Sequence, residues 1–386
     1  MPFTEQGENV LVLQGGGALG AYQAGAYLTL AEGGFDVDWI AGISIGAINA
    51  AIIAGNPPAK RTRQLRAFWE HVTADVIELP WLEHSALRPL ANELAAAHAM
   101  LWGIDGFFTP RLPHFYPIDL FKPDFWKGPV SVYETFPLRA TLLDLVDFDY
   151  LNEKGPRLSV GAVDVESGNF TFFDSRNQVI SPEHIMASGA LPPGFPPVEI
   201  EGRYYWDGGL VSNTPLQYVL EEPGECPLLI FQIDLFSAWG HMPTNLLEVQ
   251  HRDKDIRYSS RTRLTTDRYR QLHDIAGHAA RLREKLPPEL RDDPDMQALC
   301  DAGPNRPVTL ALLIHRPSEF EGASKDYEFS RLTMTDRWHA GREDAARTLA
   351  SPIWAEHSKF TSGIEILDLG TPEEAPGRRT RRKTGL

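Results

Sequence analysis

Near its N-terminus the sequence twice places a short apolar run directly before a glycine-containing turn. Residues 10–14 (Val-Leu-Val-Leu-Gln) predict a buried strand, and Gly15-Gly16-Gly17-Ala18-Leu19-Gly20 follows at once. Residues 37–41 predict a second short strand, which leads into Gly42-Ile43-Ser44-Ile45-Gly46. Each turn precedes a stretch typical of a helix. Repetition of this strand, turn and helix order is typical of a parallel sheet with helices on its faces.

The same alternation continues toward the C-terminus. Further strands are expected at residues 158–165, 169–173, 204–207, 228–235 and 308–314, and helices at residues 18–32, 45–54, 87–100, 182–189, 214–221, 250–286 and 336–349. The chain has 386 residues, which suits one large α/β domain or a core with a substantial appendage. With 42% hydrophobic and 23% charged residues, it can bury a real core, and the bulk of it is not of the disordered class.

Residues 80–136 break the pattern. This insertion holds eleven of the 39 aromatic residues of the chain, with many prolines and no clean period. Its aromatic side chains form either a small core of their own or the lining of an apolar ligand groove. The sequence leaves both interpretations open.

The charge distribution bears on the partners of the chain. The net charge of −15 argues against a general nucleic-acid binder. Residues 250–286 nevertheless carry ten Lys or Arg against five Asp or Glu, and residues 376–386 carry five basic residues and no acid. We expect residues 361–386 to be a weakly structured basic tail.

The expected location follows from cysteine usage and from apolar runs. Two cysteines, Cys226 and Cys300, are too few for a disulfide scaffold and suit a reducing compartment. The N-terminal residues lack the basic segment and apolar run of a secretory signal. No run approaches the roughly 18–20 apolar residues of a membrane span. We therefore expect a cytoplasmic protein, and contact with a membrane surface stays open.

The glycine loop at residues 15–20 has two interpretations. Its backbone N–H groups and the helix N-terminus behind them favour a negative charge, which could be a pyrophosphate or a developing oxyanion. Dinucleotide binding needs an acidic residue at the C-terminal end of the second strand. Asp36 and Asp38 stand at its beginning instead, so the sequence disfavours a nucleotide.

Ser44 lies in a G-x-S-x-G turn between a predicted strand and a predicted helix, the context of a nucleophile elbow. A serine hydroxyl needs a base. Three histidines follow in the chain, but none sits in a distinctive turn: His241, His315 and His339. Asp207, at a predicted strand end before Gly208-Gly209, is the better candidate, although Asp-Gly is also an ordinary turn.

These three elements together resemble the patatin-like phospholipase family over roughly residues 10–220. The resemblance implies an α/β protein with three layers (α/β/α), a mostly parallel central sheet, and a Ser–Asp dyad. It matches Ser44 to the nucleophile, Asp207 to the base, and the backbone of Gly15, Gly16 and Gly17 to the oxyanion hole. The supporting motif positions are Gly20, Gly42, Gly46, Gly208 and Gly209.

Other parts of the chain also bear on the resemblance. Residues 187–193 resemble the segment that precedes the family's D-G-[AG] motif. The region after about residue 225 resembles a C-terminal extension of some bacterial members, and we expect residues 221–360 to form a helical and strand extension packed on the core. Leu19 stands where many members have Arg or Lys, and Gln14 where they have Asp. A missing cation in the loop puts a phospholipid substrate in question.

The sequence therefore predicts a serine hydrolase that cleaves lipid esters, of phospholipase A or lysophospholipase type, in lipid catabolism. We expect no metal site and no cofactor, because no cluster of His, Asp, Glu or Cys has ligand spacing. The alternatives are a hydrolase of another hydrophobic ester, such as a polyester or thioester, and a lipid-binding module without activity. The sequence does not indicate the oligomeric state.

Overall fold

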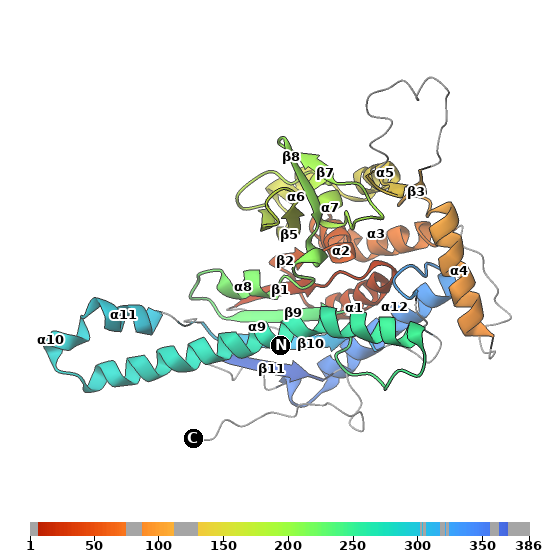
Figure 1. The fold of residues 1–386 in the computed structure, drawn as a ribbon. Coiled ribbons are helices and arrows are strands. Elements are labelled where there is room, and N and C mark those ends of the chain that lie inside the picture. The colour runs from red at the N-terminus through yellow and green to blue at the C-terminus, as the bar shows by residue number, and fades with distance from the viewer. Residues whose placement is uncertain are drawn as a thin grey trace.

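The computed structural model describes residues 7–74, 87–111, 130–301, 303, 306–316, 321, 324–355 and 363–369. Of the aromatic insertion at 80–136, residues 80–86 and 112–129 lie outside this part, as do residues 361, 362 and 370–386 of the predicted tail. Figure 1 shows a central sheet with helices on both faces and one long helix, α9, that extends well beyond the edge of the sheet.

The central sheet contains nine strands within the described ranges, in the order β11-β10-β9-β1-β2-β5-β8-β7, with β6 also paired to β5. All neighbours from β11 to β5 are parallel, whereas β6, β7 and β8 pair antiparallel. The strands are β1 (Glu8–Leu13), β2 (Trp39–Gly42), β5 (Arg157–Asp164), β6 (Phe170–Asp174), β7 (Val198–Ile200), β8 (Arg203–Asp207), β9 (Leu228–Asp234), β10 (Val308–Ile314) and β11 (Ile364–Asp368). The predicted mostly parallel α/β fold is confirmed.

The helices cover both faces of this sheet (Figure 1). They are α1 (Gly20–Glu32), α2 (Ile45–Ala54), α3 (Pro58–His71), α4 (Arg88–Trp102), α5 (Phe136–Leu145), α6 (Phe148–Glu153), α7 (Pro182–Ser188), α8 (Leu216–Glu221), α9 (Leu246–Lys285), α10 (Pro288–Arg291), α11 (Pro294–Asp301) and α12 (Arg331–Ala350). A separate two-stranded ribbon joins β3 (Thr109–Pro110) to β4 (Tyr133–Glu134). None of the helices in the described ranges is long and apolar enough to cross a bilayer.

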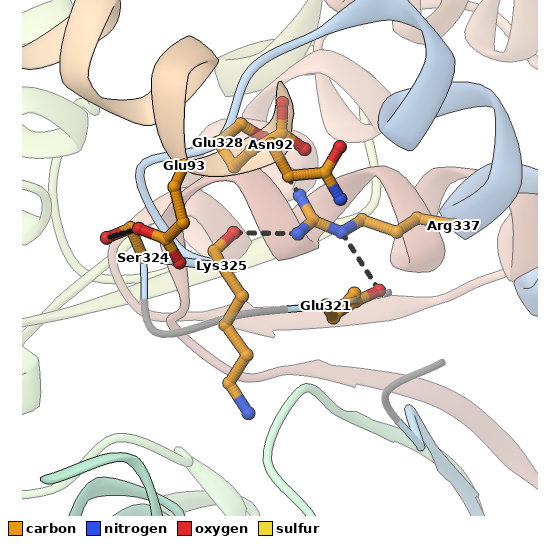
Figure 2. Close-up of a pocket in the computed structure, with 7 residues that line it drawn as sticks. All are labelled: Asn92, Glu93, Glu321, Ser324, Lys325, Glu328 and Arg337. Atoms are coloured by element: carbon orange, nitrogen blue, oxygen red, sulfur yellow. Dashed lines mark hydrogen bonds and ion pairs between the residues drawn. The ribbon is translucent and has the colours of Figure 1, made fainter. Parts of the chain in front are cut away.

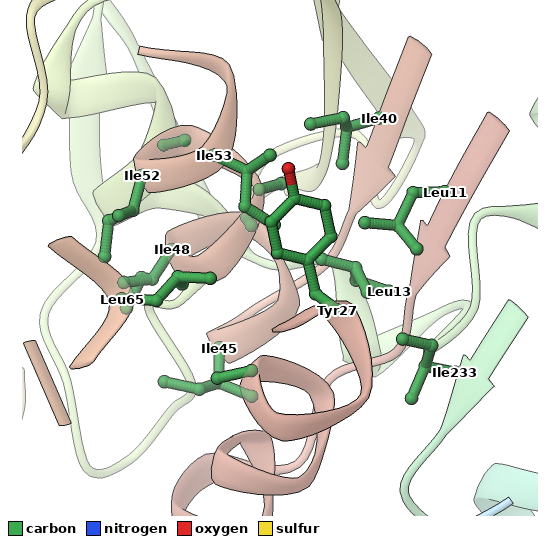
Figure 3. Close-up of a cluster of buried hydrophobic side chains, with 14 of the residues drawn as sticks. Leu11, Leu13, Tyr27, Ile40, Ile45, Ile48, Ile52, Ile53, Leu65 and Ile233 are labelled. Atoms are coloured by element: carbon green, nitrogen blue, oxygen red, sulfur yellow. The ribbon is translucent and has the colours of Figure 1, made fainter. Parts of the chain in front are cut away.

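Alternation along the strands divides the core between the two faces. In β1, Leu11 and Leu13 pack in the larger cluster with α1, α2 and α3, whereas Val10 and Val12 pack on the other side with residues of α8 and α9. Figure 3 shows Tyr27 at the centre of the larger cluster, surrounded by isoleucines of α2 and by side chains of the strands. Both faces of β1 are fully buried, as expected of a strand inside a parallel sheet.

The C-terminal part of the chain is built into the same sheet rather than attached beside it. β9 and β10 extend the sheet next to β1, and α12 packs against α1. This packing is close because glycines face backbone: a Cβ on Gly25 would lie 2.0 Å from the Trp338 carbonyl oxygen, and one on Gly341 would lie 2.1 Å from that of Tyr22.

The tail prediction needs a correction. Residues 361–386 are expected from sequence to be weakly structured, yet Ile364–Asp368 forms β11, parallel to β10. Ile364 and Leu367 are buried against the core, so this short segment gains apolar burial as well as backbone hydrogen bonds. The basic residues 376–386 lie outside the described residues.

Candidate active site

Ser44 occupies a strained turn between β2 and α2. Its φ of 56° and ψ of −126° lie in a region that side chains other than glycine rarely adopt. Close packing explains the flanking glycines: a Cβ on Gly42 would lie 2.5 Å from the Gly46 carbonyl oxygen, and one on Gly46 would lie 2.4 Å from that of Leu13. The turn sets Ser44 at the N-terminus of α2, where the helix dipole favours negative charge.

The sheet brings Asp207 to this turn. β2 and β8 both pair with the edge of β5 that β6 leaves open, and they approach each other end to end. Gly42, the last residue of β2, is opposite Val160, and Asp207, the last residue of β8, is opposite Ala162. Val160 and Ala162 are separated along β5 by Gly161 alone. The turn that follows β2, which carries Ser44, therefore lies next to Asp207 at the end of β8.

Ser188, at the end of α7, forms hydrogen bonds to both the serine turn and β5. Its hydroxyl donates to the Gly161 carbonyl oxygen at 2.6 Å and accepts from the Ser44 backbone N–H at 3.0 Å. Ser188 is fully buried, so both hydrogen bonds are shielded from water. It therefore ties the serine turn to the middle of β5.

The Asp207 carboxyl is buried, with 1% of its surface exposed. Burial raises its pKa to about 7, although hydrogen bonds from the Gly209 N–H, at 2.7 Å, and from the Ser44 hydroxyl act in the opposite direction. Its proton affinity therefore lies close to neutral pH. A carboxylate of this kind can accept a proton from the serine that donates to it.

The glycine loop faces the same place and its N–H groups are unequally engaged. The Gly15 N–H donates to the Asn213 carbonyl oxygen at 3.1 Å, and that of Ala18 donates to the Asp326 carbonyl oxygen at 2.9 Å. The N–H groups of Gly16 and Gly17 have no hydrogen-bond partner within the part of the chain that the structure describes. Gly17 has a φ of 56°, and a Cβ there would meet the Asp326 carbonyl oxygen at 2.3 Å. Two free donors thus stand beside Ser44.

These groups line one cleft of about 770 Å³, a volume that includes the space open to solvent at its mouth. Ser44, Asp207 and the three loop glycines contribute to it together. Its apolar lining consists of Ile45, Ile48, Phe107, Phe108, Leu191, Phe195, Phe236 and Phe329. Such a lining, with a few polar groups at one place, suits a hydrophobic ligand that carries one reactive bond.

Phe107 and Phe108 of the aromatic insertion belong both to the hydrophobic core and to the lining of the cleft. Both line the cleft, and both belong to the main core cluster, with 8% and 3% of their surface exposed. Phe107 packs on Phe329 with ring centroids 5.9 Å apart, and the rings of Phe107 and Phe108 each pack on Phe195. They are core residues on one side and groove residues on the other.

The histidines that the structure describes lie outside this cleft. His315 is buried and its Nε2 lies 3.2 Å from the Glu321 carboxylate, whereas His241 and His339 are exposed. Likewise, no group of three or more His, Cys, Asp or Glu side chains among the described residues could hold a metal ion.

Several residues of the site are not identified by the sequence analysis. Asn213 holds Gly15 from both sides, because its Nδ2 also donates to the Gly15 carbonyl oxygen at 2.8 Å. The position of Asn213 shortly after Asp207-Gly208-Gly209 is the sequence feature that could have identified it. Lys254 and Tyr258 of α9 and Asp326 and Tyr327 before α12 also line the cleft. No local pattern marks these four, since they come from segments far away in the sequence.

A second, smaller pocket of about 180 Å³ is lined by charged and polar side chains (Figure 2). Arg337 lies at its centre and donates to the carbonyl oxygens of Lys325 and Glu328 at 2.8 and 3.1 Å. Burial raises the pKa of Glu321, but the charges of His315 and Arg337 outweigh it and hold that pKa well below its usual range. Arg337 pairs with Glu321 and Lys325 pairs with Asp255, so we assign these two basic residues a structural role in fixing the segment before α12.

Comparisons with known proteins point to one family. The sequence profile described as "Patatin-like phospholipase" matches residues 11–220, which is more than half of the chain. A second profile, described as "Patatin phospholipase", matches residues 256–360. No curated protein sequence matches the chain significantly.

Solved structures that resemble the chain are distant in sequence. VipD from Legionella pneumophila is 13% identical, with 86% of this chain and 67% of that chain covered and a TM-score of 0.33. Human GIVD cytosolic phospholipase A2 is 12% identical, with 89% and 63% covered and a TM-score of 0.38. ExoU from Pseudomonas aeruginosa, solved with SpcU, is 16% identical, with 68% and 52% covered and a TM-score of 0.28. The chain therefore spans between about half and two thirds of the length of these proteins.

Proposed function

Because the chain belongs to the patatin-like phospholipase family, we propose that it is a serine acyl hydrolase that cleaves carboxylic ester bonds of lipids through Ser44 and Asp207. The observation that carries the proposal is that Ser44 and the buried Asp207 carboxyl, whose pKa burial raises to about 7, line the same largely apolar cleft. This arrangement supports a serine nucleophile that acts with a carboxylate base.

The first step is attack of the Ser44 oxygen on the ester carbonyl carbon while Asp207 takes the hydroxyl proton. The negative charge that develops on the carbonyl oxygen is stabilised by the free N–H groups of Gly16 and Gly17. Collapse of this intermediate breaks the ester C–O bond, and Asp207 returns the proton to the leaving alcohol. The acyl group remains on Ser44.

The second step repeats the same proton transfers with water. Asp207 takes a proton from a water molecule, which attacks the acyl-serine carbonyl, and the same N–H groups donate to the oxyanion. As the ester bond to Ser44 breaks, Asp207 gives this proton to the Ser44 oxygen, which restores the hydroxyl and releases a carboxylic acid. Gly15 contributes shape rather than a donor, because its N–H is held by Asn213.

The proposal is tested by turnover of a p-nitrophenyl ester and by labelling with a fluorophosphonate probe. The wild-type protein should turn over the ester and label at Ser44, and Ser44→Ala should lose both. Ser167→Ala, in the exposed turn between β5 and β6, is the matched control and should retain both. A folded wild-type protein that neither labels nor hydrolyses esters of any chain length would contradict the proposal.

A further inference from the structure

The cleft contains a polar cluster that the chemistry of ester cleavage does not use. Lys254 and Tyr258 come from α9, and Asp326 and Tyr327 come from the segment before α12. Lys254 forms an ion pair with Asp326, and its ammonium lies 5.7 Å from the centre of the Tyr327 ring. These side chains therefore contribute a charged cluster to a cleft whose other side chains are largely apolar.

The charged cluster is held firmly in place. A second ion pair of 2.7 Å joins the same two segments, with Asp255 of α9 as the acid and Lys325 as the base. The Asp326 carbonyl oxygen accepts from the Ala18 N–H of the glycine loop. The Arg337 guanidinium donates a hydrogen bond to the Lys325 carbonyl oxygen (Figure 2). Asp326 is therefore presented to the cleft by a rigid segment.

The two tyrosines provide hydrogen-bond donors beside the proposed base. Burial raises the pKa of Tyr258, and raises that of Tyr327 to about 12, so both hydroxyls keep their protons. The charge of Asp207 also contributes to both shifts, which places the hydroxyls within electrostatic range of it. Neither hydroxyl has a hydrogen-bond partner among the residues that the structure describes.

Resting on the proposed function, we propose that Lys254, Asp326, Tyr258 and Tyr327 form a subsite for a zwitterionic lipid head group. The Lys254 ammonium would bind the phosphate, and the Asp326 carboxylate with the Tyr rings would bind the cationic amine. The acyl chain would lie against the apolar side chains of the cleft.

Charge balance favours a zwitterion over a ligand with one charge. Lys254 and Asp326 are largely buried, with 32% and 11% of their side chains exposed, and they neutralise each other. An anionic head group that takes Lys254 leaves the Asp326 carboxylate without its cation, which is costly away from water. A zwitterion replaces the ion pair by two new ones and leaves no charge unpaired.

The test compares esters with identical short acyl chains, used as monomers in solution: a phosphatidylcholine, a phosphatidylglycerol and a p-nitrophenyl ester. Wild-type protein should cleave the phosphatidylcholine with a higher kcat/KM than the phosphatidylglycerol. Lys254→Gln should lower the ratio of phosphatidylcholine to p-nitrophenyl ester kcat/KM by at least about tenfold, the effect of one charged hydrogen bond. Asp326→Asn should lower the ratio of phosphatidylcholine to phosphatidylglycerol.

Two further variants separate head-group binding from a structural role. Lys285→Gln, exposed at the far end of α9, should leave every ratio unchanged. The exchange Lys254→Asp with Asp326→Lys restores an ion pair, so it should restore thermal stability if a single variant lowers it, but not the selectivity. If all substrates lose rate equally in Lys254→Gln, or if the exchange restores selectivity, the subsite is wrong. Ester hydrolysis that survives Ser44→Ala would instead overturn the proposed function.

Discussion

Asp207 combines two properties that oppose each other. Its burial beside Ser44 gives it a pKa of about 7, which makes it a better base than an exposed carboxylate. The same burial makes its ionised form unfavourable in the folded protein. At the residue scale, the proposed activity and the stability of the fold therefore depend on the same carboxyl in opposite ways.

The pH profile should report this carboxyl directly. Because the base must be ionised, kcat/KM should fall as the pH drops below about 7 and level off above it. Asp207→Asn keeps the shape without the base, so kcat should fall by at least ~10²-fold in steady-state ester assays. His339→Ala is the control, because that residue is exposed and does not line the cleft. An equal loss in this variant would point to a histidine base.

Relative to wild type, the Asp207→Asn variant should gain stability as the pH rises. The folded protein holds the Asp207 proton up to about pH 7, whereas the unfolded chain loses it near the ordinary carboxyl pKa of 3.8. The unfavourable contribution of this group to folding therefore grows as the pH rises between these values and stays constant above them. We expect Asp207→Asn to be more stable than wild type by roughly 1–4 kcal/mol above neutral pH.

Urea unfolding across this pH range measures the difference. The gain of Asp207→Asn should shrink as the pH falls toward the lower value, because both states of the wild type then carry the proton. Asp144→Asn, on the exposed side of α5, is the matched control and should show no such dependence. A gain that does not vary with pH would mean that ionisation of Asp207 is not its cause.

At the scale of elements, the site is a meeting of strand ends. β2 and β8 end against each other along β5, and α7 locks the junction through Ser188. The segment after α4 then adds the aromatic side chains at positions 107 and 108 to the cleft. Each element contributes one feature, and none of them alone contains a site.

The aromatic pair should set the preference for long acyl chains. Phe107→Leu and Phe108→Leu keep an apolar side chain but reduce contact with a bound acyl chain, which should weaken its binding by ~1 kcal/mol each. We expect the ratio of kcat/KM for palmitoyl over butyryl esters to fall by several-fold, roughly 5-fold per kcal/mol. Phe68→Leu, a buried core residue that does not line the cleft, should destabilise the protein without changing this ratio. Equal losses on both esters in the first two variants would mean that the rings serve only the core.

At the scale of the whole molecule, the fold is continuous across the boundary predicted near residue 220. β9 and β10 complete the sheet beside β1, and α9 covers one of its faces. The division into a hydrolase domain at residues 10–220 and an extension at residues 221–360 remains a prediction about sequence. In the structure, residues after 220 contribute side chains both to the hydrophobic core and to the lining of the cleft.

Truncation should show this dependence. A chain that ends at residue 220 loses the partner strand of β1 and the cover over Val10 and Val12, so we expect it to aggregate rather than fold. Soluble yield and amide hydrogen exchange measure the outcome. Replacing residues 280–300 by a short Gly-Ser linker is the control and should be tolerated, because the end of α9, α10 and α11 contain no buried residues in this range. A folded, active protein ending at residue 220 would show that the second part is dispensable.

The sequence by itself determined the features that depend on neighbours along the chain. The strand before Gly15, the helix at residues 45–54 and the strand at residues 308–314 follow from apolar periodicity and from turn residues. The serine turn follows from its flanking glycines, because only a residue without Cβ fits between backbone groups 2.4–2.5 Å from that position. These preferences are local, so a single sequence can express them.

Only the tertiary structure decided which of these features meet. The pairing of Asp207 with Ser44 arises because two strands end on one edge of β5, and nothing near either residue specifies that register. The same holds for Lys254 and Asp326, which enter the cleft because α9 and α12 bury their apolar sides against the sheet and against α1. Apolar burial is not directional, so the choice of partners emerges only when the whole chain packs.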